Sequence, residues 1–77
     1  METSDIYFAG YLIVTGCPVT SHTKRFDELR RKEKTFFIFE IEEAVYNERR
    51  DEYFNGGQAS IVDYNAALRN LKARCFM

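Results

Sequence analysis

The sequence predicts a small α+β domain in which a two-stranded antiparallel hairpin packs on helices in the order α-β-β-α-α. Three observations support this fold class. The 77 residues are enough for one domain, spanning 1–77. Two segments have helix caps at both ends, and the run "TFFIFEI" reads as a strand with two apolar faces. The composition, 45% hydrophobic and 30% charged, is that of a globular protein rather than a disordered one.

The stretch "TSDIYFAGYLIVTG" predicts a helix over residues 5–15. Thr3 or Ser4 can act as N-cap, Asp5 complements the helix dipole, and Gly16 can take the left-handed conformation after the last turn. Its β-branched and aromatic content is also typical of a strand, which is the alternative. As a helix it is apolar on every side, and in so short a chain this favours burial against a partner or in a homodimer.

The next two segments predict the hairpin. "CPVTSHTKRF" reads as an extended polar segment, with Pro18 at a strand start or sheet edge, and "FDELRRKEK" as the connection. "TFFIFEI" is the clearest strand, and both of its faces are apolar. Helices packed on one side of a two-stranded hairpin would cover only one of these faces and leave the other open to water. The two faces are Phe37, Phe39 and Ile41 against Phe36, Ile38 and Glu40.

Two further helices complete the prediction. The first runs over about residues 41–54, with Glu42 and Glu43 in its first turn and "NGG" at its end. The second follows Ser60, which with Asp63 resembles a capping box. Its apolar residues recur at three- and four-residue steps and predict one packing stripe, made of Ile61, Tyr64, Leu68, Leu71 and Cys75.

Together, "TSDIYFAGYLIVTG", "TFFIFE" and "EYFNGGQASIVDYNAALRNLKA" resemble the DUF5659 family of small bacterial and phage proteins of unknown function. Gly10 and the long basic connection depart from that pattern. The resemblance implies no catalytic residues, and it implies a phage or prophage accessory protein. The matching residues are Thr3, Ser4, Asp5, Ala9, Tyr11, Leu12, Gly16, Phe37, Phe39, Tyr53, Phe54, Gly56, Tyr64, Ala67, Leu68, Leu71 and Lys72.

Catalytic and metal-binding patterns are not evident. His22 reads as an exposed strand histidine, since no motif supplies it with a nucleophile or an orienting partner. Cys17 and Cys75 form no CxxC pair and read as free thiols. Acids at helix starts explain the cluster around Glu42. We therefore expect no enzyme, no metal, no cofactor and no small-molecule substrate. Without a signal peptide or an apolar run that could span a bilayer, we also expect no membrane and a cytoplasmic protein.

Binding is the remaining class of function. Surplus apolar surface favours a protein-interaction module acting on a larger assembly, for which the candidate residues are Tyr7, Tyr11, Phe36 and Ile38. The alternative is nucleic-acid binding by the basic hairpin, although acids interrupt its cations. The candidate residues for that alternative are Lys24, Arg25, Arg30, Arg31, Lys32 and Lys34.

Overall fold

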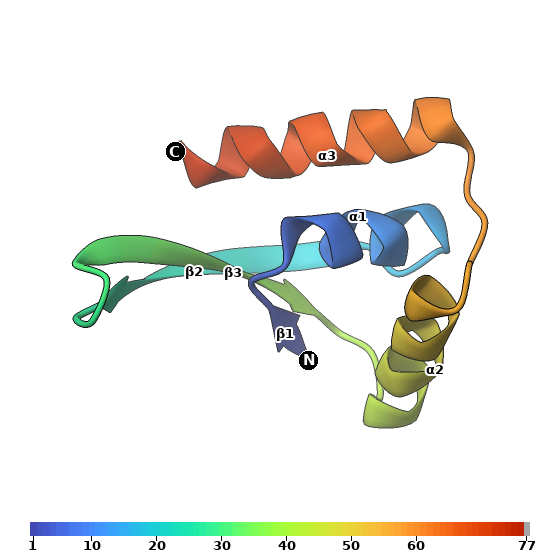
Figure 1. Ribbon diagram of the computed structural model, residues 1–77, viewed down its shortest axis with the longest axis horizontal. Coiled ribbons are helices and arrows are strands. Elements are labelled where there is room, and N and C mark those ends of the chain that lie inside the picture. The colour runs from blue at the N-terminus through green and yellow to red at the C-terminus, as the bar shows by residue number, and fades with distance from the viewer. Residues whose placement is uncertain (77) are drawn as a thin grey trace.

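A computed structural model of the chain describes residues 1–76 and confirms the α+β class. Three helices and a three-stranded antiparallel sheet form one small body (Figure 1). The elements are β1 (Glu2–Thr3), α1 (Ile6–Val14), β2 (Val19–Asp27), β3 (Lys32–Phe39), α2 (Glu43–Phe54) and α3 (Ile61–Cys75).

The sheet corrects the prediction in one respect, because it has a third strand and the element order is therefore β-α-β-β-α-α. β1 pairs with the edge of β3 that β2 leaves open, so the strand order is β1-β3-β2. Glu2 lies opposite Ile38, and Thr3 lies opposite Phe37. A strand of two residues is too short to show any alternation, so the sequence held no signal for it.

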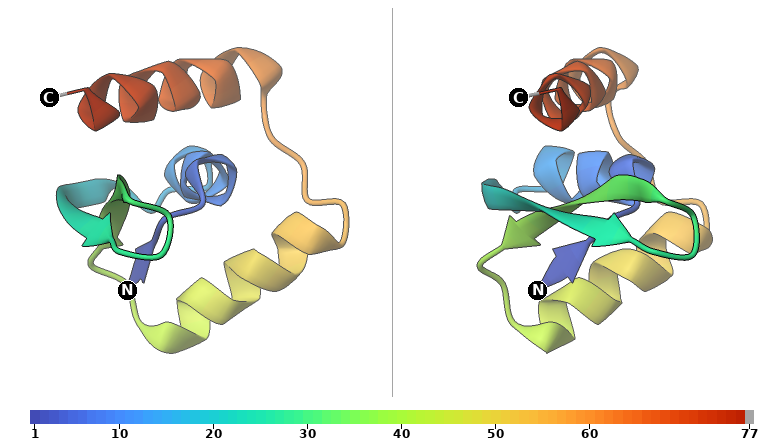
Figure 2. Two further views of the ribbon diagram at one scale, coloured as in Figure 1. Left: turned by 60° about the vertical axis from the view of Figure 1, so that its left-hand side comes forward. Right: turned by 90° about the vertical axis from the view of Figure 1, so that its left-hand side faces the viewer.

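Helix α1 lies at the centre of the molecule. α3 covers one side of it, and the sheet and α2 lie on its other sides (Figures 1 and 2). Most of its apolar circumference is therefore buried by its own chain, although Tyr7 remains 52% exposed. The buried hydrophobic side chains are Phe8, Ala9, Tyr11, Leu12, Cys17, Phe37, Phe39, Ala67 and Leu71.

The ends of α1 follow the predicted logic with one change of residue. Asp5, rather than Thr3 or Ser4, is the N-cap, and its carboxylate accepts the amides of Tyr7 and Phe8. The Thr3 hydroxyl instead accepts the amide of Asp5 at 3.1 Å. Gly16 has the expected positive φ, 97°. The segment therefore forms the predicted helix and not the alternative strand.

Close contact between α1 and α3 depends on Gly10. A Cβ at that position would lie 2.9 Å from Leu68 Cδ2 and 3.2 Å from Tyr64 Cε1. The predicted stripe of α3 is right for its middle, where Leu71 is fully buried, but wrong for Ile61, which is 76% exposed. Ile61 is the first residue of α3 and directly follows the link from α2.

We expect Gly10→Leu to lower the free energy of unfolding by about 1–3 kcal/mol, because the added side chain overpacks the contact between α1 and α3. Urea denaturation measures the change. Ala44→Leu places a leucine at an exposed site in α2 and should leave stability within about 0.5 kcal/mol. Equal stability of the two variants would contradict the close packing of α1 on α3.

The outer face of the sheet, for which the sequence predicted no cover, carries a charged side chain, Arg25, over the ring of Phe36. The Arg25 guanidinium lies 4.4 Å from the centroid of the Phe36 ring and forms two hydrogen bonds, of 2.9 and 2.8 Å, to the Glu2 carboxylate. Because Arg25 is on β2 and Glu2 on β1, this pair spans all three strands. Phe36 and Ile38 are consequently only partly exposed. Stacking and a bidentate ion pair thus take the place of a second apolar layer.

The pairing with Arg25 lowers the pKa of Glu2 below its ordinary value. A carboxyl whose pKa is lowered by folding stabilises the folded state above the ordinary pKa, and this contribution disappears as pH falls through the lowered one. We therefore expect Glu2→Gln to unfold at lower urea than the wild type at neutral pH, with the difference vanishing in acid. Glu40→Gln, an exposed residue without an ion pair in residues 1–76, is the control. A Glu2→Gln difference that persisted in acid would show that the ion pair contributes nothing.

Candidate interaction surface

The distal part of the β2–β3 hairpin, residues 24–34, extends beyond the ends of α1 and α3 (Figure 1). We call it the hairpin arm. Its connecting loop is shorter than predicted, since β2 continues to Asp27 and β3 begins at Lys32. Extension of strand pairing into "FDELRRKEK" gives the arm its length, and no helix covers it.

The arm ends in an ordered loop. The Asp27 carboxylate accepts the amides of Leu29 and Arg30 at 3.0 and 3.3 Å, and Arg31 has a φ of 52°. This turn holds Leu29 away from the protein, where its side chain is 98% exposed. Phe26, further back on the arm, is 62% exposed. The sequence offered Phe26, like Phe36, as a ring that could stack on a nucleic-acid base, but we did not single out Leu29, although a single leucine inside the charged run "DELRRK" is a signal that can be recognised.

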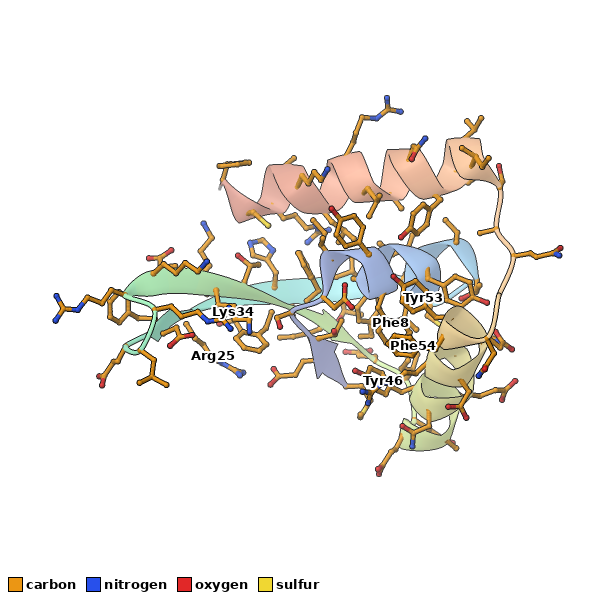
Figure 3. The ribbon with its side chains drawn as sticks, in the orientation of Figure 1. Phe8, Arg25, Lys34, Tyr46, Tyr53 and Phe54 are labelled. Carbon is orange, nitrogen blue, oxygen red and sulfur yellow. The ribbon has the colours of Figure 1, made fainter. Side chains whose placement is uncertain are left out.

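The six cations proposed for nucleic-acid binding all lie on the arm, but they do not form one surface. Lys24 and Arg25 are neighbours on β2, so their side chains point to opposite faces of the sheet. Arg25 is engaged by Glu2, while Arg30 lies 3.9 Å from Asp27. Figure 3 shows Arg25 and Lys34 on the arm. The remaining exposed cations without a carboxylate within 4.0 Å among the described residues are Arg31, Lys32 and Lys34.

The four residues proposed for protein interaction do not come together either. Tyr11 is buried, and its hydroxyl donates to Glu52 at 3.1 Å; burial and this carboxylate raise the pKa of the phenol. Tyr7 is 52% exposed on α1, whereas Phe36 and Ile38 lie on the outer face of the sheet. The sequence could not show that α2 would cover Tyr11 or that Arg25 would cover Phe36.

A small apolar cavity of about 210 Å³ lies where α1, α2 and the start of α3 meet. We call it the tyrosine pocket. Burial and the neighbouring Tyr53 and Asp5 raise the pKa of Tyr64, whose hydroxyl donates to the Tyr7 carbonyl. Phe54, 67% exposed, stands beside Tyr53 with ring centroids 5.2 Å apart (Figure 3). The lining residues are Tyr11, Tyr53, Gly57, Ala59, Ile61 and Tyr64.

Charge divides the molecule into two ends. The arm carries six basic and three acidic side chains, a net charge of +3. Since the whole chain has −1, the rest of the chain carries −4. The C-terminal end of α3, whose last turn carries Lys72 and Arg74, lies on the same side of the molecule as the arm (Figure 1). Six of the twelve acidic residues lie on α2 and the segment before it, at the other end. A separation of this kind orients a charged partner before contact.

The outer edge of β2 is the other feature open to pairing, since no strand lies beyond it (Figure 2). Pro18 precedes the strand, the register shifts between Val19 and Ser21, and Lys24 lies within it. Proline, bulges and lysines are the devices by which natural edges avoid pairing with other chains. We therefore regard this edge as protected.

The histidine and the cysteines lie apart. His22 is half-buried rather than exposed, because the last turns of α3 reach it and Arg74 Nη1 lies 3.3 Å from its Nδ1. Cys17 is buried and Cys75 partly buried, and both are free thiols. Within residues 1–76 no group of three or more His, Cys, Asp or Glu side chains could hold a metal ion. The helices of that part of the chain are all too short or too polar to cross a membrane.

Comparison with protein-family models, with curated proteins and with solved structures finds no match to this chain. The resemblance to DUF5659 proteins therefore stays a prediction, and the functional interpretation rests on the geometry of the hairpin arm and the tyrosine pocket.

Proposed function

We propose that the protein is a small, non-enzymatic protein-interaction module and that its binding element is the tip of the hairpin arm. The observation that carries this proposal is the 98% exposure of Leu29 at the apex of an ordered loop. An apolar side chain held in water by a fixed turn contributes nothing to the core of its own protein. In a complex it would fill a pocket at the centre of an interface.

The order of the loop supports this role for energetic reasons. Binding costs free energy for every side chain and loop that must become ordered. The two hydrogen bonds to Asp27 order the loop in the free protein. Binding a partner would therefore not cost the additional free energy of ordering this loop.

The surroundings of Leu29 indicate the chemistry of the partner. Arg30 and Arg31 follow it directly, and the arm as a whole carries +3. We infer that the partner surface is an apolar socket with carboxylates around its rim. Binding to a larger assembly in this way would suit an accessory or inhibitor protein of the phage type, which is the setting implied by the resemblance to DUF5659 proteins.

We expect a photo-crosslinking amino acid at position 29 to capture a protein partner in an extract of the source cells. Leu29→Asp should weaken binding of that partner about 30-fold or more, because loss of a central anchor costs 2 kcal/mol or more. Mass spectrometry identifies the captured protein, and titration calorimetry with the purified partner measures the loss.

Phe76 supplies the matched control, since it is 90% exposed but lies at the end of α3. The crosslinker at position 76 should not capture the same protein, and Phe76→Asp should bind it normally. Capture that is equal at both positions, or binding unaffected by Leu29→Asp, would refute the role of the tip.

Nucleic-acid binding is the second candidate, favoured by the exposed cations Arg31, Lys32 and Lys34 and by the exposed ring of Phe26. If it occurs, affinity for single-stranded or duplex DNA falls steeply with salt, and Arg30→Glu/Arg31→Glu abolishes it. Fluorescence anisotropy at low and physiological salt provides the test. Retention of binding in the double variant would show that the arm is not the nucleic-acid site.

A further inference from the structure

The edge of β3 that faces β1 is only partly occupied. β1 pairs with its C-terminal end alone, where Thr3 lies opposite Phe37, and the chain then turns away into α1 (Figure 1). Further along the same edge, residues 32–36 have no strand on this side among the described residues. We call residues 32–36 the free edge. We propose that an extended acidic segment of a partner protein pairs with the free edge as an additional strand.

The backbone of the free edge presents hydrogen-bonding groups outwards. Phe39 exchanges two hydrogen bonds of 2.8 Å with Met1, so its amide and carbonyl point towards β1. The carbonyl of Ile38 points the other way, since it accepts a hydroxyl from β2. These directions alternate along a strand, and β3 pairs with β2 in regular register over residues 32–38. The amides and carbonyls of Thr35 and Glu33 therefore point out of the sheet at the free edge.

A cavity of about 380 Å³ follows the free edge and gives an added strand a place to lie. It runs from Ile6 at the start of α1 to Arg30 in the loop, and from β2 only the last residue lines it. Ile6, Phe37 and Cys75 supply apolar lining, and Ile6 and Cys75 are only partly buried in the free protein. An added strand would bury its inward side chains against these residues while its backbone pairs with β3.

Charge along the free edge favours an acidic segment. Lys34 lies 6.0 Å from the centroid of the Phe36 ring, on the outer face, and Lys32 shares that face because it is two residues away. Neither lysine has a carboxylate within 4.0 Å among the described residues. Glu33, the one acid of the free edge, has its side chain on the opposite face. Carboxylates at the two positions of an added strand opposite Lys32 and Lys34 would pair with them.

The same charges make a second copy of this chain an unsuitable occupant. A two-fold pairing of the free edge with itself, centred on Glu33 or Lys34, sets lysine opposite lysine, which is unfavourable. The inference rests on the proposed function in one respect, namely that the hairpin arm binds a protein. It adds the conformation and the charge of the segment that the partner supplies.

NMR titration with a capped hexapeptide of alternating valine and glutamate tests the inference. We expect chemical-shift changes at the amides of residues 32–36. Hydrogen exchange at the amides of Glu33 and Thr35 should be fast in the free protein and slower with the peptide, because the added strand accepts both. A hexapeptide with lysine in place of glutamate should not bind, and Lys32→Glu/Lys34→Glu should reverse this preference.

Thr35→Pro removes one outward amide without removing a bond to β2, so it should weaken the valine–glutamate peptide about tenfold or more. Phe26→Pro is the matched control. Phe26 lies opposite Glu33, and its amide points to the other edge of the arm, so this variant should bind normally. The amide spectrum of each variant verifies that it is folded.

Three results would overturn the inference: no shift change at millimolar peptide, binding that Thr35→Pro leaves unchanged, or a dimer of the free protein that Thr35→Pro dissociates, since a second copy would then hold the edge. Leu29→Asp should leave peptide binding nearly unchanged. Failure of the peptide would leave capture from position 29 intact, and failure of that capture with the peptide still bound would overturn the role of the tip alone. The two proposals can therefore fail separately.

Discussion

The burial of α1 among α2, α3 and the sheet is the constraint on which the rest of the structure depends. A chain of this length buries only about 60% of its unfolded surface and has little apolar material to spare. Because its most apolar helix lies at the centre, the sheet, α2 and α3 all bury their apolar side chains against this one element. Gly10 makes this possible, because the absence of a side chain there lets α3 approach closely enough to seal the upper side of α1.

The outer face of the sheet is a consequence of that arrangement. With α2 and α3 both packed against α1, none of the three helices described covers the second face of β3. A bare face of Phe36 and Ile38 would invite association through exposed apolar surface. The Arg25 side chain covers Phe36 with its guanidinium and apolar stem, while its charge is met by Glu2 and remains in contact with water. The face is thereby shielded without a further layer of secondary structure.

The sequence predicted local structure well, because local signals are strong for it. Gly16, Ser60 and the apolar run of β3 predicted the elements within a few residues of their observed bounds. What it could not predict depends on contacts between distant parts of the chain. β1 is defined only by its pairing with β3, and the burial of Tyr11 depends on α2. The candidate site shows the same limit: the cations of the arm were recognised, but their division between two faces required the register of β2 against β3.

The hairpin arm is the part of the molecule that folding alone does not explain. Strand pairing beyond the covering helices orders several residues at a cost of about 1–2 kcal/mol each for the backbone, with little apolar burial in return. The loop then orders Leu29 in full contact with water. A shorter hairpin ending nearer the helices would serve the core equally well, since Phe37 and Phe39 lie under them. The length of the arm, its net positive charge and its apolar apex are the features on which the proposed binding role of the tip rests.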